Sequence, residues 1–148
     1  ADGGVVFVGV RPVRELRAMQ DGGGNRRVIM APDSAVRSPA VSPDGSRIVY
    51  MTSVNGNHEV YVANRDGSGP VRLTQDAAED GLPVWSPSGQ HIAFVSRRSG
   101  AWALWVMEAS GANARQIVAL PGSVDGRVKN EMEYLTKGWL EEQLAWSR

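Results

Sequence analysis

An internal repeat constrains this sequence more than any other feature. Residues 39–74 align with residues 83–118 at a constant shift of 44 positions and without a gap. Eight of the 36 aligned positions are identical, and most of these are turn-forming residues: Pro39/Pro83, Ser42/Ser86, Pro43/Pro87, Gly45/Gly89, Ile48/Ile92, Gly56/Gly100, Val62/Val106 and Gly67/Gly111. Because repeated units of this length stack on one another, the chain is expected to fold as an array of similar modules.

Each repeat unit is predicted to contain four short strands. The expected strands lie near 39–42, 47–53, 58–63 and 70–74 in one unit, and near 83–86, 91–96, 102–108 and 114–118 in the next. The Ser-Pro-Asp-Gly segment at 42–45 and the Ser-Pro-Ser-Gly segment at 86–89 join the first two strands, since Pro presets φ and Gly accepts a positive φ. Four strands in about 44 residues is the size of one β-propeller blade, so an all-β propeller is predicted.

A third unit is split between the two ends of the sequence. Val5–Val8 align with Ile48–Met51, and Asp21-Gly22 align with Asp66-Gly67. The missing first strand of this unit is predicted at 144–148, where Leu-Ala-Trp-Ser resembles Pro-Val-Trp-Ser of 83–86. The chain is therefore interpreted as one domain with three blades and one insert: residues 144–148 plus 1–31, residues 39–74, residues 83–118, and the insert 119–143.

Three blades are too few for a closed ring, because propellers usually close with four to eight. The split blade suggests how the ring is completed. Two chains that exchange their terminal strands would form a six-bladed homodimer with two-fold symmetry. The alternative is that the sequence is a piece of a longer, single-chain propeller.

The repeat motif resembles the WD40-like repeats of TolB-type propellers. The resemblance is carried by Pro83, Trp85–Pro87, Gly89, Ile92–Phe94 and Leu104–Met107. That family includes the periplasmic TolB component of envelope complexes, propeller domains of serine peptidases and many binding modules. The resemblance implies a propeller fold and a periplasmic or secreted location. It does not transfer an activity, because one fold hosts many functions.

Composition excludes several classes of protein. Sixteen basic residues balance sixteen acidic ones, which argues against binding to nucleic acid or a membrane surface through net charge. The absence of cysteine excludes disulfides, thiolate metal sites and thiol nucleophiles. No apolar stretch approaches the roughly 20 residues of a transmembrane helix, so no membrane insertion is expected.

No motif predicts a catalytic residue, a metal site or a cofactor. The sequence has no Gly-x-Ser-x-Gly nucleophile motif. His58 and His91 occupy positions that are not equivalent in the repeat, and neither has a second ligand at metal-binding spacing, so both are predicted to be solvent-facing strand residues.

The candidate binding residues lie where the loops lead into the first strand of each blade, at the mouth of the central channel. Counting back from the first-strand markers places Arg37, Asp80, Glu141 and Glu142 there. A ring of these charges would suit a cation, a polar small molecule or a basic peptide, and the alternative is a water-filled channel. Trp102 aligns with His58 and is a candidate contact for a sugar or peptide, the alternative being a buried or edge-packed side chain.

The insert 119–143 carries Val128, Met132, Leu135 and Trp139 at helical spacing. It is interpreted either as a short helix packed on a blade edge or as a partner-binding cap. The leading functional hypothesis is a non-catalytic module that binds a protein, peptide or small polar ligand at the channel mouth. The alternatives are a propeller hydrolase or lyase with a dispersed active site, and a structural propeller half without a ligand.

Overall fold

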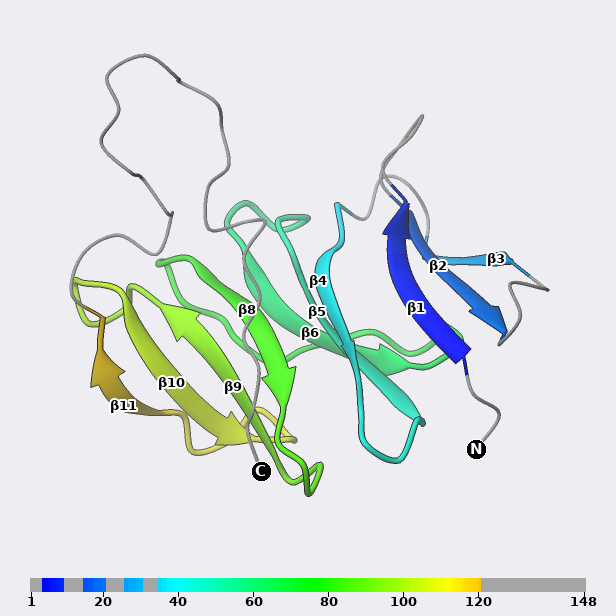
Figure 1. Cartoon of the computed structure of the whole chain (residues 1–148). Helices are drawn as coiled ribbons and strands as arrows, with labels where there is room; N and C mark the ends of the chain where they lie inside the picture. The colour runs from blue at the N-terminus through cyan, green and yellow to red at the C-terminus, as the bar shows by residue number, and fades with distance from the viewer. Residues whose placement is uncertain (1–3, 10–14, 21–25, 31–34, 121–148) are drawn as a thin grey trace, which may run out of the picture.

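The fold is that of a computed structural model in which residues 4–9, 15–20, 26–30 and 35–120 are described (Figure 1). These residues form three antiparallel sheets, with strand orders β1-β2-β3, β4-β5-β6-β7 and β8-β9-β10-β11. The strands are β1 (Gly4–Gly9), β2 (Glu15–Gln20), β3 (Arg27–Met30), β4 (Arg37–Val41), β5 (Arg47–Thr52), β6 (Glu59–Asn64), β7 (Val71–Arg72), β8 (Asp80–Trp85), β9 (His91–Ser96), β10 (Ala103–Glu108) and β11 (Arg115–Ala119). Every regular element in this part of the chain is a strand, which confirms the predicted all-β class. No helix in the described ranges is long and apolar enough to span a bilayer.

The hairpin between β4 and β5 shows why the repeated Ser-Pro-x-Gly segments are turns. Asp44 accepts hydrogen bonds from the Ser42 hydroxyl at 2.5 Å and from the Ser46 amide at 3.0 Å. The hydrogen bond from Ser42 is the main cause that lowers the pKa of Asp44 to about 2. Gly45 has a φ of +74° and donates to the Ser42 carbonyl at 2.8 Å. The equivalent Gly89 has a φ of +71°, so the sequence repeat is also a repeat of backbone conformation.

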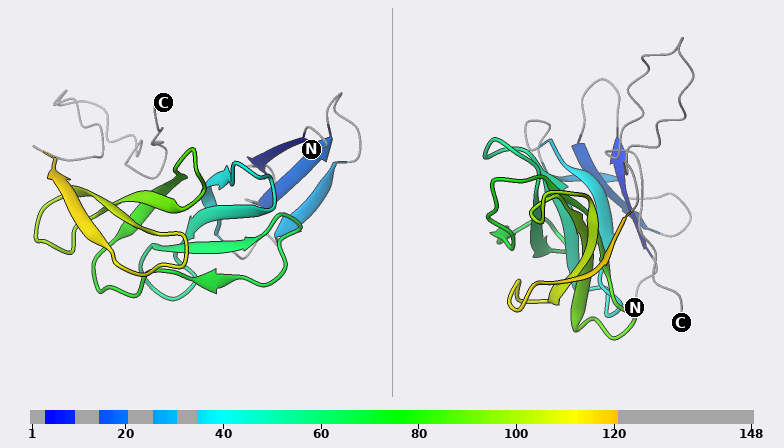
Figure 2. Two further views of the ribbon diagram at one scale, coloured as in Figure 1. Left: turned by 90° about the horizontal axis from the view of Figure 1, so that it is seen from below. Right: turned by 90° about the vertical axis from the view of Figure 1, so that its left-hand side faces the viewer.

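The three sheets stand in a row and pack face to face (Figure 2). Between the first two sheets lies a cluster that includes Leu16, Ile48 and the stacked rings of Tyr50 and Tyr61, whose centroids are 5.8 Å apart. Burial raises the pKa of Tyr50 to about 12, so its phenol stays neutral. The second and third sheets enclose a second cluster: Val49, Val60, Val62, Trp85, Ile92, Phe94 and Met107. Each fully buried side chain of this size contributes about 1.5–3 kcal/mol relative to exposure.

A turn glycine lies close against the preceding sheet at both interfaces between sheets. A Cβ atom on Gly67, in the turn after β6, would lie 1.9 Å from the carbonyl oxygen of Ile29 in β3. A Cβ atom on the equivalent Gly111 would lie 3.0 Å from the carbonyl oxygen of Leu73, just after β7. Both glycines also have φ near +90°, so the turn of each sheet needs glycine for two reasons.

The first strands begin earlier than the sequence predicts. β4 starts at Arg37 rather than Pro39, and β8 starts at Asp80 rather than Pro83. Both strands continue through an irregularity in which Ser38 and Leu82 have φ of +46° and +51°. A positive φ is uncommon for such residues, and residues that precede proline normally stay extended. The expectation that Arg37 and Asp80 lie in loops is therefore wrong, because they are the first residues of strands.

Part of the predicted organisation lies outside the described residues. The strand expected at 144–148 and nearly all of the insert 119–143 belong to that part. At the insert's first position the structure differs from the prediction, since Ala119 is the last residue of β11.

Candidate functional site

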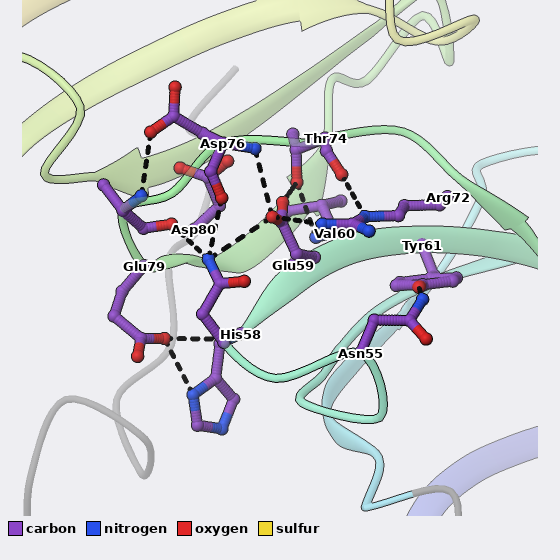
Figure 3. Close-up of polar contacts among 12 residues, drawn as sticks. Asn55, His58, Glu59, Val60, Tyr61, Arg72, Thr74, Asp76, Glu79 and Asp80 are labelled. Carbon is purple, nitrogen blue, oxygen red and sulfur yellow. Dashed lines mark hydrogen bonds and ion pairs between the residues drawn. The ribbon is translucent and has the colours of Figure 1, made fainter.

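A buried glutamate organises the connection between β6, β7 and β8. Glu59 is fully buried at the start of β6. Its Oε1 atom accepts from the Arg72 guanidinium at 2.6 Å and from the Asp76 amide at 3.1 Å, and its Oε2 atom accepts from the Thr74 hydroxyl at 2.5 Å (Figure 3). The hydrogen bond with Glu59 is the main cause that raises the pKa of Arg72. We call Glu59, Arg72 and Thr74 the Glu59 clasp.

The segment that leads from the clasp to β8 is held by side-chain to backbone hydrogen bonds. The amide of Asn57 donates to the carbonyls of Asp76 at 2.9 Å and Ala78 at 2.6 Å. Asp76 in turn accepts from the backbone amide of Ala78 at 2.8 Å. Because its backbone groups are paired in this way, the connection sets the position of the residue that follows it, Asp80.

A histidine and a glutamate lie on the outer side of the same connection (Figure 3). Nδ1 of His58 lies 2.9 Å from Oε2 of Glu79, and the His58 backbone amide donates to that oxygen at 2.8 Å. The side chain of His58 is 16% exposed, so the expectation that it faces solvent is wrong. His91, in contrast, is exposed in β9 as predicted.

Asp80 is a fully buried carboxylate whose hydrogen bonds are incomplete. Its Oδ2 atom pairs with the Arg98 guanidinium, while Oδ1 finds no hydrogen-bond partner among the described residues. Burial raises the pKa of Asp80, as does the charge of Glu59, whereas Ser96 and Arg98 act in the opposite direction. Arg98 itself lies over two neighbouring rings, with its Cζ atom 5.2 Å from the centroid of Phe94 and 5.1 Å from that of Trp105.

The other candidate residues are placed less favourably for a shared site. Arg37 is half-buried at the start of β4, where it is the equivalent of Gly81 and not of Asp80, and β4 and β8 are in contact. Trp102 is only 9% exposed, packs near Met51, Leu82 and Val95, and lies under Arg97. The hypothesis that Trp102 is an open ligand contact is therefore wrong for this structure. Glu141 and Glu142 lie outside the described residues.

The Glu59 clasp and the Asp80–Arg98 pair were not recognised from the sequence, although the repeat carries a signal for both. In the repeat alignment Glu59 occupies the position of Ala103, and Thr74 the position of Val118. Asp80 likewise aligns with Val36, and Arg98 with Val54. A polar residue in one unit that aligns with an apolar residue in the other indicates a polar network found in one sheet only. Identical positions do not carry this signal, because they mark what the two units share.

The buried carboxylates of this region are both paired with arginine. Glu59 pairs with Arg72 and Asp80 with Arg98, and no His, Asp or Glu cluster in the described ranges could hold a metal ion. Two buried polar atoms in this part of the chain have no hydrogen-bond partner, Oδ1 of Asp80 and Nε1 of Trp105. The first can accept a hydrogen bond and the second can donate one.

Comparisons with known proteins agree with the geometry of the sheets. A family model described as the TolB beta propeller domain matches residues 7–146. The Tol-Pal system protein TolB of Anaeromyxobacter dehalogenans (strain 2CP-1 / ATCC BAA-258) is 47% identical over 107 residues, which are 72% of this chain and 24% of that protein. The chain thus spans about a quarter of the length of this relative.

Two further matches widen the comparison. The uncharacterized peptidase YuxL of Bacillus subtilis (strain 168) is 34% identical over 97 residues, which are 61% of this chain and 15% of that protein. The solved structure of a putative TolB from Agrobacterium tumefaciens has a TM-score of 0.69 and 25% identity, and the match covers 76% of this chain and 44% of that one.

Proposed function

Because the chain belongs to the TolB β-propeller family, we propose that it is a non-catalytic binding module for a protein or peptide partner. The partner binds at the end of the sheets where β4 and β8 begin. Two findings support a protein partner: the family match and the similarity to a relative named as a Tol-Pal system protein. With this function we propose a periplasmic or secreted location, which rests on the resemblance to the TolB-type family.

The observation that carries the proposal is the unpaired Oδ1 atom of Asp80. A buried acceptor without a donor costs about 1–3 kcal/mol. An ammonium, guanidinium or amide N–H of a ligand would complete its hydrogen bonds. Arg37 begins β4, which is in contact with β8. A short peptide with a basic side chain would supply the missing donor to Asp80.

Fluorescence polarisation with two labelled peptides tests this proposal. An Arg-Gly-Lys peptide is the probe, and a Glu-Gly-Glu peptide of the same length is the reference. We expect Asp80→Asn to weaken binding of the basic peptide about tenfold, the equivalent of about 1.4 kcal/mol, while Arg37→Ala has a smaller effect. The matched control is Asp44→Asn, which removes the same charge from an exposed turn. Equal affinities of Asp80→Asn and wild type for the basic peptide would contradict the site. So would a wild-type protein that does not bind the basic peptide more tightly than the acidic one.

For the assembly we propose three blades, formed by residues 144–148 with 1–31, by 39–74 and by 83–118, in a ring of six blades from two chains. Each chain donates its residues 144–148 as the first strand of the partner's split blade. The three described strands β1–β3 support this, because they match the second to fourth strands of the other two sheets. Deletion of residues 144–148 is expected to give aggregates or unfolded chain, and a stable truncated monomer would contradict strand exchange.

An enzymatic role is the second candidate, and one observation favours it: burial raises the pKa of Asp80, as in many acid–base residues. The binding module is preferred because Asp80 already pairs with Arg98. The match to the peptidase of Bacillus subtilis also covers only 15% of that protein. A wild-type protein that hydrolyses aminoacyl chromogenic substrates, with loss of turnover in Asp80→Asn, would reverse this preference.

A further inference from the structure

The outermost strands of the three sheets share a β-bulge. In the first sheet, Leu16 pairs with Met30 and Arg17 with Val28, so Ile29 is the extra residue. In the third sheet, Leu104 pairs with Val118 and Trp105 with Gln116, so Ile117 is the extra residue.

The second sheet has its bulge at the same place. Leu73 and Thr74 both donate their backbone amides to the Val60 carbonyl, at 2.8 and 3.4 Å. Leu73 is therefore the bulged residue, and the pairing register independently makes Ile29, Leu73 and Ile117 structural equivalents. Bulges commonly re-aim a residue at the edge of a sheet.

Two of the three bulges receive the turn glycine of the following sheet. The carbonyl of Ile29 faces Gly67 at a distance that leaves no room for a Cβ atom, and that of Leu73 faces Gly111, where a Cβ atom would be tight at 3.0 Å. Both bulged side chains are half-buried and belong to the clusters between sheets. The bulge is thus the point at which each sheet fits onto the next.

The third bulge has the same form, but no turn glycine of the described residues lies against it. Ile117 is 47% exposed, unlike its two equivalents, and all five residues of β11 are exposed. The outer strand of the third sheet also differs from β7 in chemistry. Val118 and Ala103 stand where the second sheet has Thr74 and Glu59, so β11 has no counterpart of the Glu59 clasp. The last three residues of β11, Ile117 to Ala119, are apolar and exposed, whereas Arg115 and Gln116 at its start are polar.

We propose that the bulge at Ile117 is a docking site for a second copy of this chain, which places its first sheet against β11. The inference rests on the ring of two chains proposed above and names the contact that closes it. Continuity with the two interfaces inside the chain identifies the occupant, because a sheet of the same repeat type fits each of the other bulges. The sequence holds a third Asp-Gly pair, Asp21-Gly22, aligned with Asp66-Gly67 and outside the described residues.

The docking site makes a prediction that separates two adjacent residues. Ile117 and Gln116 are both exposed, and only Ile117 is bulged. The equivalents of Gln116 in the other two sheets remain accessible, since Val28 is 49% exposed and the Arg72 side chain 26% exposed. A charge at Ile117 would lie in the contact between copies, whereas a charge at Gln116 would occupy an exposed, paired position of the edge strand. The pair Ile117→Asp and Gln116→Asp is therefore a matched comparison.

The experiment is light scattering coupled to size exclusion on the full chain, with circular dichroism to confirm strand content. Wild type and Gln116→Asp are expected at twice 15.9 kDa, and Ile117→Asp at 15.9 kDa. If Ile117→Asp does not fold, Ile117→Ala and Gln116→Ala replace the pair, and only the first is expected to raise the dimer Kd, by at least about tenfold. A wild-type mass of 15.9 kDa would overturn the ring itself. A dimeric wild type whose Ile117 and Gln116 variants behave alike would overturn the docking site and leave the ring standing.

Discussion

Replacing Gly67 by alanine should disrupt a tight contact between the first two sheets, and the chain contains the controls needed to measure that effect. Gly67 has φ +88°, and a Cβ atom there would lie 1.9 Å from the Ile29 carbonyl oxygen. Gly100 has nearly the same φ, +92°, but a Cβ atom there meets nothing within 4 Å. Gly111 is intermediate, with φ +90° and a distance of 3.0 Å to the Leu73 carbonyl oxygen.

The three glycines separate two costs. A left-handed backbone costs a non-glycine residue about 1–2 kcal/mol, and Gly100→Ala should show this cost alone. Overpacking adds about 1–3 kcal/mol, so Gly67→Ala is expected to lose about 2–5 kcal/mol in total. The rank of destabilisation should be Gly67→Ala, then Gly111→Ala, then Gly100→Ala.

Urea unfolding followed by tryptophan fluorescence measures these free energies, at one protein concentration because association would shift the midpoint. The slope m should stay close to the wild-type value in all three variants. Equal losses for Gly67→Ala and Gly100→Ala would refute the reasoning, since the backbone cost would then explain everything and the contact with Ile29 would contribute nothing.

Three further predictions concern the polar contacts and the core. Arg72→Ala leaves the buried carboxylate of Glu59 without its cation. Urea unfolding should show a loss of unfolding free energy that approaches the roughly 3–5 kcal/mol of a broken buried ion pair. A loss below about 0.5 kcal/mol would contradict a stabilising role of the Glu59 clasp. The pKa of Asp44 is lowered to about 2, so its contribution to stability is present above the unfolded pKa of about 3.9 and is lost as pH falls through about 2. Asp44→Asn should therefore flatten the change of the urea midpoint between these pH values, and an unchanged profile would show that Asp44 does not contribute. Trp85→Phe removes the indole N–H that donates to the Ala40 carbonyl at 3.1 Å, so thermal unfolding should show a loss of about 1–3 kcal/mol; a variant as stable as wild type would mean that the hydrogen bond contributes nothing net.

The sequence predicted the strands well where turn residues bound them. β5 and β9 lie within one residue of their predicted limits, because a Ser-Pro-x-Gly turn precedes each and a continuous run of apolar residues forms the strand. The TolB-type resemblance, drawn from residues 83–107, was confirmed by the family match over 7–146. The early starts of β4 and β8 were missed, since nothing in a sequence announces a positive φ at Ser38 or Leu82.

The candidate site was predicted in part. Asp80 was selected by its position before the first strand, but its true partner, Arg98, lies 18 residues away and joins it only when β8 pairs with β9. Trp102 was selected as an unusual residue in the repeat alignment. Its burial depends on packing from Met51 and Leu82 in two different sheets, which no local pattern reports.

The two interfaces between sheets use different side chains, and this bears on how a repetitive chain folds. Repeat proteins can misassemble when one unit takes the place of another. Here the stacked Tyr50 and Tyr61 face the first sheet, while the equivalent Phe94 and Trp105 face the second and adjoin Arg98. A third sheet placed where the second belongs would put the carboxylate of Asp80 at the position of Val36, which is buried in the apolar cluster with Leu16. Because the units differ in these side chains, each sheet fits best at one position in the row. The order of the sheets is therefore determined by side chains as well as by chain connectivity.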